Sequence, residues 1–187
     1  MTDAIRAFVA LEMPDDVRRR IGELQHRLRP LLPPARWTRP AGQHLTLKFL
    51  GDSAPAVLDS LAEELASQLL VLGAVRVELR EGGFFPSRRR PRVAWIGGSA
   101  AGGERAAVVV ERVAGQHGFP PDGRPWTPHL TQARLDRPWP RAAVEHFLDE
   151  TERLDLPPFE CREAVLLASR LGPGGAVYTP LARLPLQ

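Results

Sequence analysis

The spacing of hydrophobic residues along this chain switches repeatedly between two periods, which predicts strands alternating with helices. The apolar stretch Ala7–Met13 precedes a proline and is typical of a strand. A helical spacing follows as far as Pro30, and further helices are expected after Ser53 as a cap, over 100–117 and from Pro140. The remaining strands are expected over residues 35–38, 44–51, 74–85, 92–98, 129–135, 161–171 and 176–184.

Two of the expected strands begin with the same tripeptide, His-Leu-Thr, a short distance after a Trp-Thr pair. Side chains two residues apart share one face of a strand, so His44, Thr46 and Lys48 should line one face of the first strand. His129 and Thr131 should do the same on the second. Each strand therefore offers a polar face that could line a groove.

The opposite faces of these two strands should fill a core. Leu45, Leu47 and Phe49 are expected there in the first strand, and Leu130 and Gln132 lie opposite the histidine in the second. The repeated Trp-Thr and His-Leu-Thr pattern is a weak internal sequence repeat. It favours a duplicated α+β unit in which two lobes bring the two motif strands beside each other.

Two facing His-x-Thr pairs could carry out acid–base chemistry on a phosphate. An imidazole titrates near pH 6.5, and a hydroxyl can donate a hydrogen bond to an anionic oxygen. One histidine can take a proton from the attacking oxygen while the other protonates the departing one, as in-line displacement at phosphorus requires. Neither a metal nor a cofactor is needed.

Two other interpretations of the motif are open. A single His-x-Thr on a strand more often forms ordinary edge-strand hydrogen bonds. A metal site is the other alternative, although two histidines without a nearby acid or a local His-x₃-His spacing make a poor ligand set.

The composition shows a strong preference for arginine over lysine and contains only one cysteine. Lys48 is the only lysine among 25 Lys and Arg residues, the net charge is +3 and the pI is about 9.9, which permits an anionic partner without demanding one. The densest basic run, Pro86–Arg92, is typical of a solvated loop or of a rim that faces phosphates. Cys161 is the only cysteine, so it forms no internal disulfide and is expected to be a small buried apolar residue.

The chain length suits one domain or two small lobes that share a core. No apolar run approaches the length of a membrane helix, and the N-terminal stretch is too acidic for a secretory signal. We therefore expect a cytoplasmic protein with no membrane partner.

Four stretches together resemble the 2H phosphoesterase superfamily, and within it the RNA 2′,3′-cyclic phosphodiesterase branch, historically called 2′-5′ RNA ligases. They are HLTLKFLG, FFPSRRRPRVAWIG, GFPPDGRPWTPHLTQARL and SRLGPGGAVYTPLARLPL. The resemblance spans nearly the whole chain. It implies a bilobal α+β fold with pseudo-two-fold symmetry, two antiparallel sheets facing a central cleft and helices outside. Residues 1–187 would form a single catalytic domain.

The resemblance also implies roles for residues. His44 with Thr46 would form the first motif, and His129 with Thr131 the second. His44 would donate a proton to the departing 3′ oxygen, and His129 would accept one from water. No cofactor is implied. The substrate would be RNA with a 2′,3′-cyclic phosphate end, or a cyclic nucleotide, and the product a 2′-phosphate.

Two basic residues are candidates for binding the substrate. Arg134 matches an arginine of this branch that contacts phosphate. However, it lies five residues after His129, an offset that a regular strand would send to the other face, so the strand should end or bulge before it. Lys48 has the right parity for the cleft. Tyr178 could stack on a base or pack in the core.

Alternative functions remain open at this level. The same site could join a 2′,3′-cyclic phosphate to a 5′-hydroxyl end as a 2′-5′ RNA ligase. The fold could also serve as a non-catalytic nucleotide- or RNA-binding module. The other histidines, His26, His117 and His146, lie on or beside expected helices and are interpreted as surface or packing residues. The protein is expected to be a monomer.

Overall fold

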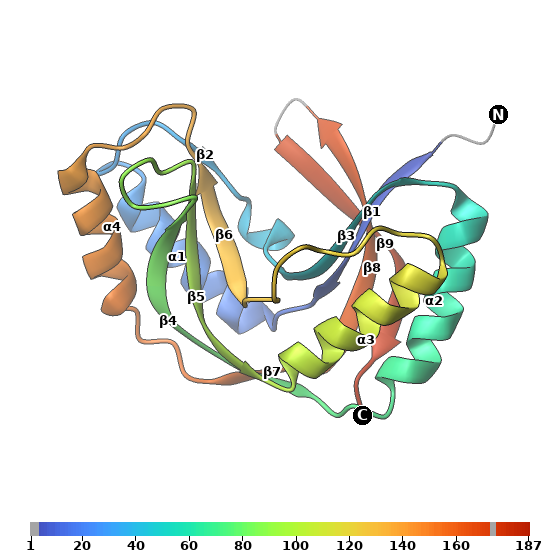
Figure 1. Cartoon of the computed structure of the whole chain (residues 1–187). Coiled ribbons are helices and arrows are strands. Elements are labelled where there is room, and N and C mark those ends of the chain that lie inside the picture. Colours follow the sequence, from blue (N-terminus) through green and yellow to red (C-terminus); the bar gives the residue numbers. More distant parts are fainter. Residues whose placement is uncertain (1–3, 173–174) are drawn as a thin grey trace.

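Two antiparallel sheets stand beside each other in the computed structural model, which describes residues 4–172 and 175–187, with helices on their outer sides (Figure 1). This architecture confirms the α+β fold expected from the sequence. The first sheet has four strands in the order β3-β1-β8-β9 and the second has five in the order β2-β6-β5-β4-β7. Neighbouring strands pair antiparallel throughout.

The first sheet joins the two ends of the chain. Its strands are β1 (Ile5–Leu11), β3 (Leu45–Ser53), β8 (Glu163–Gly172) and β9 (Gly175–Pro185). Two helices lie on its outer side, α2 (Pro55–Leu69) and α3 (Gly103–Gln116) (Figure 1). Leucines at helical spacing on α2 are all buried, as the periodicity predicts: Leu58, Leu61, Leu65 and Leu69.

The second sheet is built from the middle of the chain. Its strands are β2 (Arg36–Trp37), β4 (Val75–Phe85), β5 (Val93–Ala101), β6 (His129–Arg134) and β7 (Phe159–Cys161). The helices α1 (Asp15–Leu28) and α4 (Arg141–Glu152) accompany it, and a short 3-10 helix, η1 (Pro40–Gly42), precedes β3.

Two helices cross between the sheets and interlock the lobes. α1 follows β1 of the first sheet but bonds to the second, where Gln25 donates to Gln132 of β6 at 3.1 Å. α3 follows β5 of the second sheet but packs against β3 of the first. One continuous set of buried apolar side chains therefore runs through both lobes.

Some local expectations are wrong. Ser53 does not cap α2, because the cap residue is Ala54 and the Ser53 hydroxyl donates to the Gly51 carbonyl. The short strand β7 was not anticipated as a separate element, because three residues are too few to show a period. Cys161 is buried in it as expected, and burial raises the pKa of its thiol to about 12. None of the helices in the described residues is long and apolar enough to span a membrane.

Candidate active site

His44 sits at the junction between η1 and β3. Its Nδ1 lies 2.8 Å from the Gly42 carbonyl oxygen, which can only accept, so Nδ1 carries the hydrogen. The neutral ring therefore presents an unprotonated Nε2 on its other side. Phe8 of β1 and Tyr178 of β9 flank the ring, with centroids 4.6 and 5.0 Å from it.

His129 repeats this arrangement on the second sheet. Its Nδ1 lies 2.9 Å from the carbonyl oxygen of Thr127, again two residues earlier in the chain. Phe85 and Trp95 lie beside the ring at centroid distances of 5.0 and 6.5 Å. Each histidine is thus held by the carbonyl two residues before it and by two aromatic rings, and these aromatic partners were not anticipated.

Burial dominates the pKa of His44. Burial lowers the pKa of His44 to about 4, the Gly42 carbonyl opposes this shift, and the charges of Arg18 and His129 add to the lowering. Burial also raises the pKa of Tyr178, against the charge of Arg134 on the other sheet. In the free protein His44 is therefore neutral at pH 7. The indole of Trp126, which leads into the second motif, bonds to the Thr46 carbonyl of the first, so both motif strands border one groove.

An irregularity in β3 changes which side chains face this groove. Ala10 pairs with Thr46 and Val9 with Lys48, so Leu47 has no partner on β1 and forms a β-bulge. Phe8, which contacts His44, pairs with Phe49. The bulge therefore leaves Thr46 on the groove face, as expected, but reverses the alternation after it.

Lys48 consequently lies on the opposite face of the sheet from His44, and the expectation that it shares the groove face is wrong. Its side chain is only 1% exposed. The ammonium donates to Glu111 of α3 at 2.8 Å and to the Pro120 carbonyl at 2.9 Å, and Asp122 lies 3.5 Å away. This ammonium fastens α3 and the loop after it to β3, so we leave Lys48 out of the phosphate site proposed below.

Phe49, the next residue, lies on the groove face of β3 and not in the core. It was expected in the core, but its side chain is 63% exposed. Its ring lies 5.9 Å from that of Phe8, on the groove face.

A β-bulge also occurs in β6, and it explains how Arg134 reaches the same face as His129 despite the odd offset of five residues. Trp95 pairs with Thr131 and Ala94 with Ala133, which leaves Gln132 as the bulged residue. Arg134 then pairs with Val93, which shares a face of β5 with Trp95. Arg134 therefore joins Thr131 on the groove face, as the bulge considered from the sequence would require.

The repeated Trp-Thr pairs explain how the two motifs are tied together. Trp37 pairs with Ala133 of β6, and the Thr38 amide donates to the Gln132 carbonyl at 2.8 Å. Trp126, which precedes the second motif, donates from Nε1 to the Thr46 carbonyl of β3 at 2.7 Å. The segment that leads into each motif is thus bonded to the strand of the other.

A buried cluster of three glutamine side chains lies between the motifs. Gln43, directly before His44, and Gln25 of α1 both donate to the side-chain oxygen of Gln132, at 3.4 and 3.1 Å. Gln132 in turn donates to the Leu130 carbonyl. All three glutamines are almost fully buried. The cluster joins α1, the residue before the first motif and the bulge after the second.

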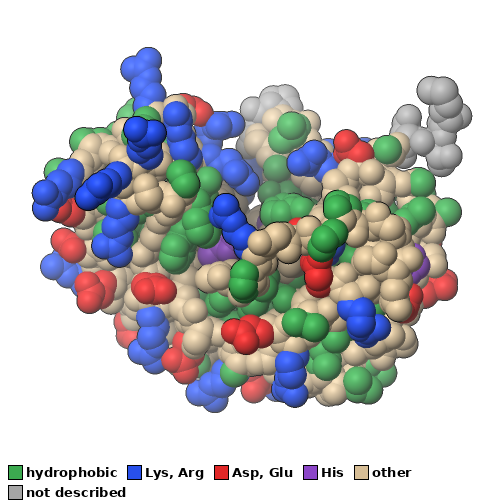
Figure 2. Space-filling model, viewed as in Figure 1, with side chains coloured by type: hydrophobic (Ala, Val, Ile, Leu, Met, Phe, Trp, Pro, Cys, Tyr) green, Lys and Arg blue, Asp and Glu red, His purple; other side chains and the backbone are tan. Residues whose placement is uncertain are grey.

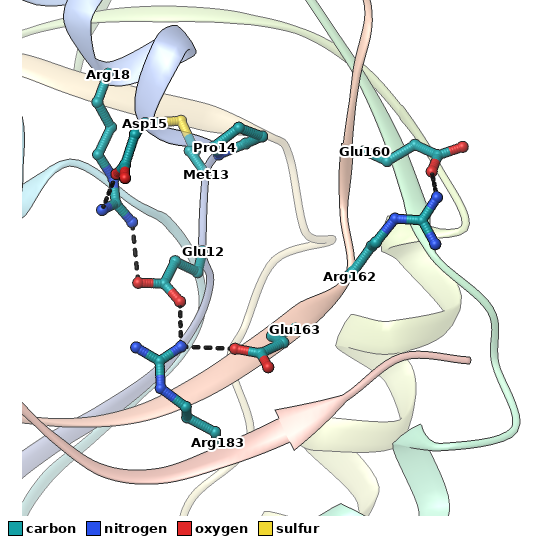
Figure 3. A pocket seen from close by; sticks show the side chains of 9 residues that line it. All are labelled: Glu12, Met13, Pro14, Asp15, Arg18, Glu160, Arg162, Glu163 and Arg183. Carbon is teal, nitrogen blue, oxygen red and sulfur yellow. Dashed lines mark hydrogen bonds and ion pairs between the residues drawn. The ribbon is translucent and has the colours of Figure 1, made fainter.

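A hollow of about 420 Å³ lies beside this region, where the chain crosses between the sheets (Figure 3). Its charged side chains are paired: Arg18 bonds to Glu12, and Arg183 bonds to both Glu12 and Glu163. A smaller hollow of about 110 Å³ adjoins His44 and Tyr178 and shares Arg18 and Glu12 with the first. Of the two motif histidines, only His44 lines the smaller hollow, and the larger one holds ion pairs that brace the crossing segments.

The basic run of the β4–β5 loop lies at the rim of the groove. The loop begins at Phe85, whose ring contacts His129, and the side chains of Arg88, Arg89 and Arg90 are exposed. Figure 2 shows Lys and Arg side chains gathered over the half of the molecule that holds the second sheet, beside a hollow between the two halves. The rim therefore carries positive charge that is available to an anion.

The other histidines lie on the helices, as expected. His26 is exposed on α1, His146 lies on α4, and His117 follows α3 and lies 3.0 Å from Glu64 of α2. Within residues 4–172 and 175–187, no three His, Cys, Asp or Glu side chains are grouped so as to hold a metal ion.

Known proteins share both the sequence and the fold. Residues 11–95 and 98–178 match the family described as LigT like phosphoesterase. The RNA 2′,3′-cyclic phosphodiesterase of Thermus thermophilus is 34% identical, over 98% of this chain and 91% of that protein. The protein of the same name from Methanothermobacter thermautotrophicus is 27% identical over 95% of this chain and 96% of its own length.

Two solved structures extend the comparison. TT0787 of Thermus thermophilus superposes with a TM-score of 0.79 at 28% identity, covering 97% of both chains. LigT of E. coli, complexed with 3′-AMP, superposes with a TM-score of 0.76 at 25% identity and covers 98% of this chain and 99% of its own. With the family match spanning most of its length, the chain belongs to the LigT like phosphoesterases, a 2H phosphoesterase family.

Proposed function

We propose that this protein hydrolyses 2′,3′-cyclic phosphate ends of RNA to 2′-phosphates without a metal ion. One observation carries the proposal. The two imidazoles are held in the same way by a carbonyl two residues earlier, so that each leaves Nε2 free, and the segment that leads into each motif is bonded to the strand of the other. The names of its relatives, RNA 2′,3′-cyclic phosphodiesterase, support the substrate class.

In the proposed reaction, water attacks phosphorus and the bond to the 3′ oxygen breaks. One Nε2 takes a proton from the water, and the other imidazolium gives its proton to the departing 3′ oxygen. The hydroxyls of Thr46 and Thr131 and the guanidinium of Arg134 hold the non-bridging oxygens. Because one ring gains a proton and the other gives one up, the net charge of the pair does not change, and each ring recovers its starting protonation state by exchanging a proton with solvent.

The pKa of His44 bears on which ring is the acid. The family pattern makes His44 the donor, yet His44 is neutral in the empty groove at pH 7. An anionic phosphate beside the ring would favour its protonated form and raise this pKa. The assignment of His44 as acid therefore requires that the substrate itself brings the ring to its protonated state.

The test measures hydrolysis of 2′,3′-cyclic AMP by His44→Ala and His129→Ala, with phosphorus NMR to identify the opened isomer. Each variant should lose activity by about 10²–10⁴-fold, since each removes a positioned acid or base. His26→Ala, which removes an exposed histidine of α1, is the matched control and should retain activity. Full activity of either motif variant with an unchanged circular dichroism spectrum would exclude the paired mechanism, and loss of wild-type activity on EDTA treatment would indicate a metal.

The same assay separates the alternatives. Supplying a 5′-hydroxyl oligonucleotide with the cyclic end would give a longer product if the protein were a 2′-5′ ligase. Binding of the nucleotide without turnover would indicate a binding module.

We propose that residues 1–187 act as one catalytic unit, as a monomer in the cytoplasm.

A further inference from the structure

The matching bulges of β3 and β6 create a pair of equivalent positions with opposite chemistry. In each strand the bulged residue follows the motif threonine, Leu47 in one and Gln132 in the other. The side chain five residues after each histidine therefore faces the groove. On the second sheet that residue is Arg134, and on the first it is Phe49.

The first sheet thus has an apolar ring where the second has a cation. Single exposed apolar residues are common on protein surfaces and need no explanation by themselves. Phe49 differs because of its surroundings: its ring contacts Phe8, and Phe8 in turn contacts His44. Only one ring separates Phe49 from the imidazole.

The backbone holds Phe49 in place. Its neighbour Lys48 is fixed on the opposite face of the sheet by Glu111 and the Pro120 carbonyl. A strand alternates its side chains, so anchoring Lys48 on the helix side keeps Phe49 on the groove side. The ring is therefore a pre-oriented, accessible surface rather than a mobile side chain that could fold back into the core.

We propose that Phe49 stacks on the nucleobase of the nucleotide that bears the cyclic phosphate. The first sheet then binds the base, while Arg134 of the second sheet holds the phosphate. This inference rests on the proposed function and names the part of the substrate that each lobe recognises. Stacking on an aromatic ring tolerates every base, because every base has a π-face.

The experiment compares two substrates in the Phe49→Ala variant. One is 2′,3′-cyclic AMP, and the other is 1-O-methylribose 2′,3′-cyclic phosphate, which has the same reacting group but no base. Stacking is worth about 1–3 kcal/mol per base, so kcat/KM for cyclic AMP should fall by about 5–150-fold. The value for the abasic substrate should not change, and Phe49→Trp should restore activity toward cyclic AMP.

Val108→Ala is the matched control, because Val108 of α3 is exposed to a similar degree, 66%. It should behave as wild type with both substrates. An unchanged kcat/KM of Phe49→Ala for cyclic AMP would overturn the proposal. An equal decrease with both substrates would also overturn it, because Phe49 would then act on the catalytic groups and not on the base.

Binding separates this inference from the proposed function. Calorimetric titration with adenosine 2′-monophosphate and with ribose 2-phosphate does not depend on turnover. Phe49→Ala should weaken binding of the adenosine compound only. If the wild type opened neither cyclic phosphate, the proposed function would fail, but a selective decrease in nucleotide affinity would still support stacking, and equal affinities in wild type and variant would refute it.

Discussion

Replacing Lys48 with methionine tests whether this residue is a structural anchor or a ligand of the substrate. Methionine keeps much of the buried stem but removes the ammonium. The variant lacks two charge-assisted hydrogen bonds, to Glu111 at 2.8 Å and to the Pro120 carbonyl at 2.9 Å, together with the ion pair to Asp122 at 3.5 Å. A hydrogen bond to a charged group is worth about 1.5–3 kcal/mol, and breaking a buried ion pair costs about 3–5 kcal/mol.

The loss of stability in Lys48→Met should be smaller than for a fully buried pair. The Glu111 side chain is 34% exposed to water, and it keeps its hydrogen bond from the Asp122 amide. We therefore expect Lys48→Met to lower the free energy of unfolding by about 2–3 kcal/mol. The assay is urea denaturation followed by circular dichroism at pH 7. The KM for 2′,3′-cyclic AMP should be unchanged, because Lys48 lies on the face of β3 away from His44.

A pH series checks the cause. Burial raises the pKa of Glu111, but the hydrogen bonds from Lys48 and the Asp122 amide outweigh this and leave it below 4.5. Since the folded pKa lies below the unfolded one, this stabilisation is present above about pH 4.5 and is lost as the pH falls through the folded pKa. Lys48→Met should therefore lose less stability in acid than the wild type does.

Glu111→Gln is the matched variant. It keeps an acceptor for Lys48 but removes the charge, and it should cost little once Lys48 is already methionine, because the two residues are coupled. Unchanged stability of Lys48→Met together with a raised KM would refute this reasoning and would return Lys48 to the substrate site.

Three further predictions follow from other parts of the groove. Since burial lowers the pKa of His44 from 6.5 to about 4, this group should cost the wild type up to about 3 kcal/mol of stability as the pH falls from 6.5 to 4. In urea denaturation His44→Gln should lack that decrease, and parallel pH profiles of the two proteins would contradict the prediction. Gln132→Leu removes the side-chain oxygen to which Gln25 and Gln43 donate and leaves Gln25 only its longer bond, 3.5 Å, to the Gln132 carbonyl. The variant should lose about 1–3 kcal/mol for each lost bond in thermal denaturation, whereas an unchanged melting temperature would show that the cluster contributes nothing. Replacing residues 88–90 with alanine should reduce the salt dependence of kcat/KM for a single-stranded RNA with a cyclic end. The log–log slope should fall by up to about 0.7 for each arginine that binds a phosphate, while kcat/KM for 2′,3′-cyclic AMP should be unaffected. Equal salt slopes in wild type and variant would exclude the loop from RNA binding.

Much of the candidate site was predictable because it depends on local pattern. Alternating and helical spacings identified the main strands and helices, and the repeated His-Leu-Thr placed two polar faces on strands. The parity conflict of Arg134 already offered a bulge in β6 as one of its explanations, beside an early end of the strand. The irregularity of β3 became visible only in the structure, where Leu47 and Leu50 are both buried although they are three residues apart.

Other parts of the site could not be predicted because they depend on which segments pack together. The partners of Lys48 come from α3 and from the loop after it, far away in sequence. The glutamine cluster gathers three side chains that no periodicity connects. Burial of an imidazole among aromatic rings sets the pKa of His44, and burial is a property of the packed protein.

The sequence by itself determined the order and type of the main strands and helices and the identity of the two motifs, because hydrophobic period and side-chain chemistry are local properties. The tertiary structure alone decided which side chains share the groove. It bonded the segment that leads into each motif to the strand of the other, and it shifted the alternation after each motif threonine by one residue. In β6 the shift set Arg134 beside Thr131. In β3 it turned Lys48 inward to α3 and left Phe49 exposed, because a bulge exchanges the faces of the residues that follow it, here as far as a second bulge at Leu50.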